Sequence, residues 1–222
     1  KIGVDVPEAY QLISSGDTDA VFQLEQGGMK KFMKDLQPNC LEDLIAGISL
    51  YRPGPMDFIP QYIENKHHPE KIVYDTPYLE PILKNSYGVI IYQEQVMQIF
   101  QQLAGYSLGQ ADLVRRAMAK KKKKELMEQK DKFIYGAPDE GITGCASLGI
   151  PAEVAAKIFA DMESFASYAF NKSHAAAYAV VAYRTAYLKA FYPKEFLAGI
   201  LNDRIDKIDE ISKYILYMKE KN

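Results

Sequence analysis

The stretch from His174 to Tyr192 constrains the fold more than any other part of the sequence. It contains neither glycine nor proline, and apolar residues occupy almost every side of the helix that it predicts. A helix that is apolar nearly all round needs cover on every side, so we expect this one to be central and buried. Ser173 stands directly before it, and a serine hydroxyl in that position is expected to cap the first turn.

Shorter helices, separated by glycine and proline, account for most of the remaining chain. The helix expected over residues 93–104 has Gly105 as its stop signal. Ser107 and Gln110 have the spacing of a capping box, which starts the next helix. Helical spacing of apolar residues or proline and glycine boundaries predict the other helices, over residues 7–14, 29–36, 41–50, 151–167, 193 onward and 208–218.

The expected fold class is therefore mainly α, an irregular multi-helix domain with one or two very short β segments. The β-compatible runs are residues 20–24 and 87–92. We expect one structural unit over residues 1–222 and, where it subdivides, an N-terminal helical part over 1–135 and a C-terminal helical part over 148–222. The chain opens without a methionine or a helix cap, so we expect it to be part of a longer polypeptide.

Composition excludes several classes of protein. The 222 residues are 48% hydrophobic and 25% charged, a balance typical of a folded globular protein and not of a disordered one. Two cysteines cannot form a disulfide framework, so a reducing cytoplasm is the expected location. No apolar run approaches the ~20 residues of a membrane span. The formal net charge of −2 predicts no general attraction to nucleic acid, so any site for an anion must be local.

One candidate anion site lies in a basic segment near the middle of the chain. On a continuous helix, Arg116, Lys120 and Lys123 fall at positions i, i+4 and i+7, so three cations share one face. Such a face suits a polyphosphate, because guanidinium groups bind phosphate oxygens through two hydrogen bonds and lysines add movable charge. A solvated basic helix end is the alternative interpretation.

The neighbouring arginine pair differs from the lysine run over residues 121–124. That run is best explained as solvated charge and is expected to tolerate single substitutions. Arg115 and Arg116 stand among Ala, Leu, Val and Met, where two unpartnered guanidinium groups are costly. The pair therefore predicts an anionic partner.

The second candidate site is the start of the long helix. A helix N-terminus presents N–H groups and the positive end of its dipole, and Lys172 and His174 add donors beside it. The alternative is purely structural, with Ser173 as a cap, Lys172 solvated and His174 packed at the helix start. The sequence contains no credible catalytic triad, no Walker-type loop and no Asp-x-Asp pair for metal ions.

Several runs, in the same order along nearly the whole chain, resemble the bacterial replicative DNA polymerase III alpha subunits, the C family of DNA polymerases. The runs are Gly16-Asp17-Thr18 with Val21-Phe22-Gln23-Leu24-Glu25, Tyr51-Arg52-Pro53-Gly54-Pro55, Tyr92-Gln93-Glu94-Gln95-Val96-Met97, Ala111-Asp112-Leu113-Val114-Arg115-Arg116-Ala117-Met118 and Phe170-Asn171-Lys172-Ser173-His174-Ala175. The resemblance implies the fingers domain of such an enzyme. The family's palm, with its metal-binding aspartates, has no counterpart in these residues.

The resemblance also implies roles for individual residues. Arg115 and Arg116 would face the triphosphate of the incoming deoxynucleotide. Lys120 is expected to bind the same triphosphate, from its place on the basic helix face. The residues implied near the nascent base pair are Asn171, Lys172, Ser173, His174 and Tyr178. No cofactor is expected on this chain, and Mg²⁺ is expected in the palm of the full enzyme.

The implied partners are the incoming dNTP, primer–template DNA, and the palm and other domains of the same polymerase. A sliding clamp would be bound only through regions absent here, and no membrane is expected. The chain alone is expected to be inactive. Two alternatives stay open at this point: a stand-alone helical module that binds nucleic acid or protein through a basic helix face, and a purely structural scaffold.

Overall fold

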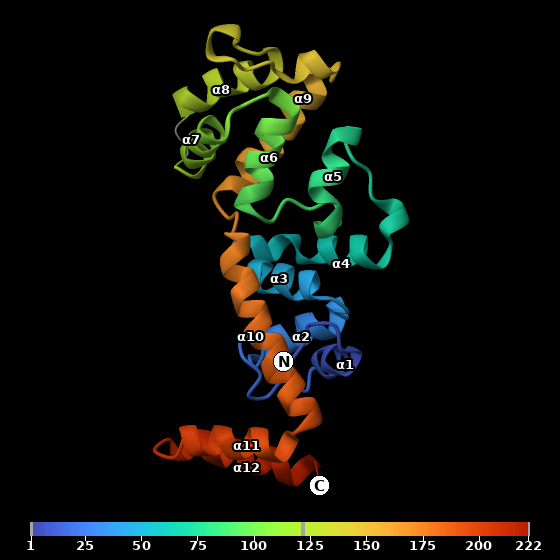
Figure 1. Cartoon of the computed structure of the whole chain (residues 1–222), viewed down its shortest axis with the longest axis vertical. Helices are drawn as coiled ribbons and strands as arrows, with labels where there is room; N and C mark the ends of the chain where they lie inside the picture. The colour runs from blue at the N-terminus through green and yellow to red at the C-terminus, as the bar shows by residue number, and fades with distance from the viewer. Residues whose placement is uncertain (1, 121–122, 222) are drawn as a thin grey trace. The chain divides into compact units, whose positions relative to one another are not determined.

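The computed structural model describes residues 2–120 and 123–221, and helices dominate it (Figure 1). This confirms the mainly α fold class. The α-helices are α1 (Pro7–Ser15), α2 (Gly27–Leu36), α3 (Leu41–Leu50), α4 (Ile59–His67), α5 (Glu80–Leu83), α6 (Gln93–Ala104), α7 (Leu108–Ala119), α8 (Lys123–Tyr135), α9 (Ala152–Ala166), α10 (Lys172–Phe191), α11 (Pro193–Asp203) and α12 (Ile208–Lys221). Short 3-10 turns join many of them, and within the described residues β pairing is limited to two isolated bridges.

The packing groups the chain into two compact units. One comprises Lys1–Ile48 and Ala176–Asn222, and the other comprises Ser49–Ala175. The boundaries fall inside α3 and α10. This grouping differs from the division into residues 1–135 and 148–222 expected from the sequence, and that division stays a prediction.

The core of the Ser49–Ala175 unit lies among α6, α7, α8 and α9, which gather side by side in the green and yellow part of Figure 1. Phe100 of α6 is fully buried, and its ring lies 5.0 Å from Tyr106, 5.2 Å from Phe133 and 6.0 Å from Phe159, centroid to centroid. Edge-to-face and tilted ring pairs of this kind add to the free energy gained from burial alone. The core fixes α7, which carries the arginine pair.

Local sequence signals set the end of α6 and the start of α7 as expected. Gly105 ends α6 with a φ of 75°, a left-handed conformation that glycine adopts without a steric penalty. The Ser107 hydroxyl accepts the backbone N–H of Gln110, and the Gln110 side chain accepts the N–H of Ser107 in return. The predicted capping box is therefore confirmed.

The long helix is only partly buried. Among the buried residues of α10 are four alanines at 175, 179, 182 and 186, which form one stripe, whereas Val181 and Leu188 are exposed. The expectation of a helix covered on all sides was wrong. Alanine is the most frequent apolar residue of α10, and its small side chain exposes little apolar surface. Burial of one alanine stripe is therefore enough to hold the helix in the fold.

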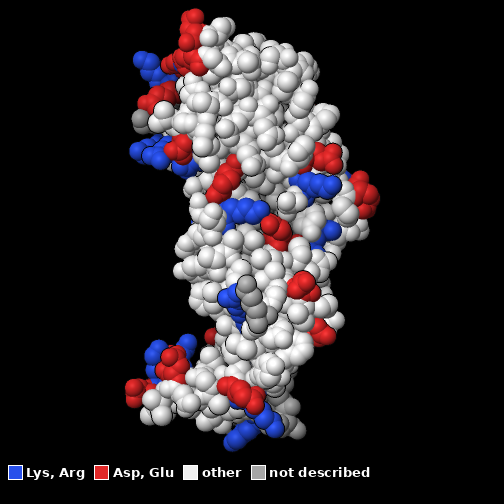
Figure 2. All heavy atoms as spheres, viewed as in Figure 1, with Lys and Arg blue, Asp and Glu red and all other residues white. Residues whose placement is uncertain are grey.

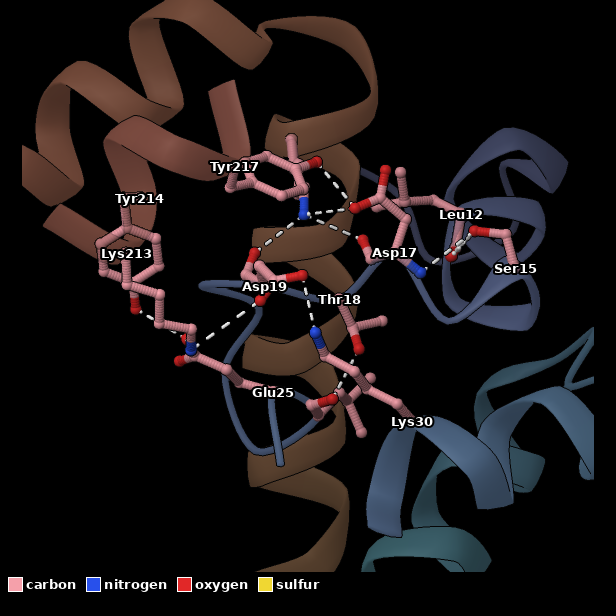
Figure 3. A network of polar contacts seen from close by, with 12 residues as sticks. Leu12, Ser15, Asp17, Thr18, Asp19, Glu25, Lys30, Lys213, Tyr214 and Tyr217 are labelled. Atoms are coloured by element: carbon pink, nitrogen blue, oxygen red, sulfur yellow. Dashed lines mark hydrogen bonds and ion pairs between the residues drawn. The ribbon is translucent and has the colours of Figure 1, made fainter. Parts of the chain in front are cut away.

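In the unit formed by Lys1–Ile48 and Ala176–Asn222, a buried lysine anchors the loop after α1. Lys189 of α10 donates to the backbone oxygens of Asp17 and Asp19, each at 2.9 Å, and to Asp17 Oδ1 at 3.1 Å. The hydroxyl of Tyr217 in α12 donates to the same Asp17 Oδ1 at 2.7 Å. Figure 3 labels Asp17, Asp19 and Tyr217 of this network, in which the Tyr217 contact ties α12 to the loop. Burial lowers the pKa of Lys189.

The β-like interpretation of residues 20–24 was wrong, because the same loop folds as consecutive turns. Thr18 accepts the N–H of Val21 through its carbonyl and donates its hydroxyl to the carbonyl of Leu24 at 2.6 Å. Ala20 and Gln23 both have a φ of 63°, which interrupts an extended strand. Of residues 87–92, Tyr92 forms an isolated bridge and no longer strand is present in this described segment.

Candidate functional site

Two distant sequence motifs meet at the start of α10. Phe170 and Tyr92 form a parallel bridge in which the Phe170 N–H donates to Ile91 O and the Gln93 N–H donates to Phe170 O, each at 3.0 Å. The Gln93 side chain also donates to Ala169 O at 3.1 Å. The bridge therefore attaches the segment before α10 directly to the segment before α6.

Glu94 and Asn171 cap the first turn of α10. The Lys172 N–H lies 3.2 Å and 3.1 Å from the two carboxylate oxygens of Glu94, and Asn171 Nδ2 donates to Glu94 Oε1 at 3.0 Å. Asn171 Oδ1 in turn accepts the N–H of His174 at 2.9 Å. The expectation that Ser173 caps the helix was wrong: the helix begins at Lys172, so Ser173 lies inside it and Asn171 supplies the cap.

Arg52 braces the same segment from another motif. Its Nη2 donates to Tyr168 O at 2.8 Å, and its Nε donates to Ser49 O at 3.0 Å. The guanidinium carbon lies 4.3 Å from the centroid of the Phe170 ring, within the range of a cation–π contact. Burial lowers the pKa of Arg52. The guanidinium group stays charged, because the pKa of an arginine lies far above neutral pH.

The predicted polar side chains at the start of α10 face outward. Ser173 and His174 are exposed, and the His174 and Phe170 rings form an edge-to-face pair at a centroid distance of 5.5 Å. This excludes the interpretation of His174 as a packed core histidine. Lys172 is half-buried, with Nζ 5.2 Å from the centroid of the Tyr92 ring. Lys172 and His174 therefore lie together with Asn171 on one capped turn.

Tyr178 belongs to the compact unit formed by Lys1–Ile48 and Ala176–Asn222, whereas Lys172 and His174 belong to the Ser49–Ala175 unit. Tyr178 is half-buried on α10, where its ring packs against Phe22 of the loop after α1 at 5.3 Å, centroid to centroid. The N–H of Phe22 also donates to Thr185 Oγ1 at 3.1 Å. The expected place of Tyr178 near the nascent base pair stays a prediction.

The arginine pair on α7 shares one carboxylate. Asp112 Oδ1 accepts Nε and Nη2 of Arg115 at 3.1 Å and 2.7 Å, and Asp112 Oδ2 accepts Nη2 of Arg116 at 2.8 Å. The hydrogen bonds from Arg115 and the charges of both arginines lower the pKa of Asp112. The anionic partner that the sequence predicted is thus supplied, in this structure, by the same helix. The Arg115 side chain is 14% exposed, whereas that of Arg116 is 64% exposed.

The expected single face of three cations was wrong. Helix α7 ends at Ala119, Lys120 is its exposed C-cap, and a separate helix, α8, begins at Lys123. Arg116, Lys120 and Lys123 therefore do not share one continuous helix. Of the lysine run, Lys121 and Lys122 lie outside the described residues, as does the side chain of Lys123, and Lys124 is exposed.

The surface charge around these helices is mixed. Among the described residues on the face shown in Figure 2, basic and acidic side chains are interspersed. Across residues 2–120 and 123–221, no group of three or more His, Cys, Asp or Glu side chains is arranged to hold a metal ion. No helix in this same part of the chain has the length and apolar character needed to cross a bilayer.

Sequence reasoning missed Arg52 and Glu94 as site residues. Both stand in runs on which the family resemblance rests, but neither residue signals by spacing or composition what it contacts. Glu94 precedes Lys172 by 78 residues, and Arg52 precedes Tyr168 by 116. The partnership of Asp112 with the arginines, in contrast, follows the i+3 and i+4 spacing of a helix and was detectable in the sequence.

Comparison with known proteins places these motifs in one family. Residues 1–141 match the family model of the bacterial DNA polymerase III alpha subunit finger domain. The DNA polymerase III subunit alpha of Thermus aquaticus is 47% identical over 220 residues, which cover 97% of this chain and 17% of that protein. The subunits of Chlamydia trachomatis and Pasteurella multocida are each 48% identical and cover 96% and 95% of this chain. The chain spans 17–18% of the length of these relatives.

Proposed function

Because this chain belongs to the family of the bacterial DNA polymerase III alpha subunit finger domain, we propose that it acts as the fingers of a replicative DNA-directed DNA polymerase. It binds the triphosphate of the incoming dNTP and packs on the nascent base pair during template-directed synthesis. The observation that carries the proposal is the arginine pair of α7, in which Asp112 orients two guanidinium groups and leaves Arg116 largely exposed.

The proposed reaction is nucleotidyl transfer. A primer 3′ hydroxyl attacks the α-phosphate of the dNTP, the bond to the β-phosphate breaks, and pyrophosphate departs. Negative charge grows on the leaving β- and γ-phosphates, and Arg115 and Arg116 stabilise it with charge-assisted hydrogen bonds. Lys120, exposed at the end of the same helix, adds movable charge.

The capped start of α10 supplies the second contact. Lys172 and His174 lie on one turn whose N-terminus also carries the positive end of the helix dipole. We assign Asn171, Lys172, Ser173 and His174 to the vicinity of the nascent base pair. Closure of the helical domain over a correct base pair brings these donors and the arginine pair into place, which is how induced fit adds selectivity.

The remaining machinery belongs to other parts of the proposed polymerase. Magnesium ions are expected in its palm, and when bound they stabilise the attacking and leaving oxygens. Partners of the proposed fingers are primer–template DNA and the palm and other domains of the same polypeptide, in the cytoplasm. The chain alone is proposed to be inactive, and metal-dependent primer extension by the purified 222-residue chain would contradict this.

Single-nucleotide incorporation by the full polymerase tests the proposal. Replacing both Arg115 and Arg116 with Ala is expected to lower kcat/KM for the dNTP by ~10²-fold or more, because each lost charged contact is worth about 1.5–3 kcal/mol. The control is Arg184→Ala, which removes an exposed arginine from α10. Unchanged kinetics in the double variant would reduce the pair to a solvated helix face and favour a structural scaffold.

A further inference from the structure

Glu94 determines the orientation of the Asn171 side chain, which caps α10 by accepting the N–H of His174. A carboxylate only accepts hydrogen bonds, so the Asn171 amide must direct Nδ2 toward Glu94 Oε1, at 3.0 Å. That orientation leaves Asn171 Oδ1 to accept the N–H of His174, at 2.9 Å. Glu94 also accepts the N–H of Lys172 with both oxygens, which fixes the backbone of the same turn. Glu94 therefore acts on the backbone of His174 through Asn171.

Arg52 holds the Phe170 ring, which is in contact with the His174 imidazole. Two hydrogen bonds, to Ser49 O and Tyr168 O, hold the guanidinium group, whose carbon lies 4.3 Å from the Phe170 centroid. The Phe170 ring contacts the His174 imidazole edge to face, at 5.5 Å and an interplanar angle of 68°. Arg52 therefore acts on the imidazole of His174 through Phe170.

We propose that Glu94 and Arg52 are positioning residues for His174, each acting through one intervening residue. The inference rests on the proposed function, because it gives His174 a kinetic role at the nascent base pair. His174 is exposed, so packing alone does not hold its side chain in one orientation. Glu94 acts through Asn171 on the backbone of His174, and Arg52 acts through Phe170 on its ring. Preorganisation of this kind lowers the entropy that must be lost when substrate binds.

A set of double-mutant cycles in the full polymerase tests the inference. Glu94→Gln and Arg52→Lys are made both in the natural sequence and in a His174→Ala background, and kcat/KM for the correct dNTP is measured per active site. In the natural background each is expected to lower kcat/KM about 10-fold, within the coupling found between contacting residues. In the His174→Ala background each is expected to change it less than about 2-fold, because the group being positioned is gone.

Controls separate positioning from a loss of folding. Glu153→Gln removes the charge of an exposed first-turn glutamate on α9 and is expected to leave kcat/KM unchanged. Urea unfolding is measured for every variant. Should Glu94→Gln fail to fold, Glu94→Asp replaces it. Phe170→Leu is a second test of the path from Arg52 to His174, because it removes the aromatic ring between them. In this background Arg52→Lys should leave kcat/KM unchanged.

The outcomes distinguish this inference from the proposed function. If His174→Ala impairs incorporation and Glu94→Gln and Arg52→Lys cause the same loss in both backgrounds, the positioning inference is overturned and the proposed function stands. If His174→Ala itself leaves incorporation unchanged, both the inference and the assignment of His174 to the nascent base pair are wrong.

Discussion

Arg115 and Asp112 lie one helical turn apart on α7, and the arginine donates from both Nε and Nη2 to a single carboxylate oxygen, at 3.1 Å and 2.7 Å. Arg116 reaches the other oxygen of the same carboxylate. The two arginines nevertheless differ, because the Arg115 side chain is 14% exposed and the Arg116 side chain 64% exposed. We infer that Arg115 contributes more to the local structure of α7 and that Arg116 has more surface available for phosphate.

Single substitutions are expected to separate these roles. Arg116→Ala should raise the KM for dNTP by about 10-fold or more. It should change the free energy of unfolding by no more than about 0.5 kcal/mol, because an exposed i,i+4 ion pair such as that with Asp112 contributes little to stability. Arg115→Ala should lower both catalytic efficiency and stability. Steady-state incorporation and urea unfolding measure the two quantities. Equal losses of stability in the two variants would contradict the division of roles.

The Asp112 carboxylate gives a pH-dependent signature. The hydrogen bonds from Arg115 and the charges of both arginines lower its pKa in the folded chain. A carboxylate whose pKa is depressed on folding stabilises the fold at every pH above its unfolded pKa, and this contribution is lost as the pH falls through the folded value. Carbon-detected NMR titration should find the Asp112 pKa below about 3.9, the usual value for Asp. In the Arg115→Ala variant the pKa should rise, and an unchanged value would contradict the assignment.

The cap of α10 predicts a difference between two neighbouring polar residues. Asn171→Ala removes the side-chain oxygen that accepts the His174 N–H and should cost about 1 kcal/mol of stability. Ser173 lies inside the helix, so Ser173→Ala should be neutral or slightly stabilising, because Ala has the higher helix propensity. His174→Ala should likewise spare stability while impairing incorporation. Urea unfolding of the three variants tests the order, and a larger loss in Ser173→Ala than in Asn171→Ala would restore Ser173 as the cap.

Lys189 should be the most costly lysine to remove from its unit. Its side chain is 3% exposed and donates to three oxygens of Asp17 and Asp19, so Lys189→Ala leaves a partly buried carboxylate without its cation. Breaking such a pair typically costs about 3–5 kcal/mol. The control is Lys213→Ala: this side chain is 54% exposed, and its pair with Glu25 should be worth at most about 1 kcal/mol. Similar unfolding midpoints for both variants would show that the buried pair contributes little.

Local sequence signals predicted much of the fold. The Gly105 stop of α6 and the Ser107–Gln110 capping box of α7 each depend on residues within one or two turns of each other, so the local sequence contains the whole signal. The break between α7 and α8 was missed because residues 116–124 are good helix formers with no glycine or proline to mark the end of the first helix.

The candidate site was predictable only in part. Asn171 and Ser173 are both strong capping residues two positions apart, and propensity alone does not choose between them. The structure decides in favour of Asn171, because Glu94 binds its amide group from another helix. Contacts across 77 and 116 residues, such as those of Glu94 and Arg52, depend on tertiary packing that periodicity does not encode.

The affinity of the full polymerase for nucleotides with and without a γ-phosphate tests the central claim most directly. In the natural sequence, a dNTP should bind much more tightly than the matching dNDP to the enzyme–primer–template complex. If Arg115 and Arg116 contact the triphosphate, replacing both with Ala should abolish most of that difference, because the lost charged contacts are each worth about 1.5–3 kcal/mol. An undiminished preference for the dNTP in the double variant, with Arg184→Ala as the control, would contradict the account.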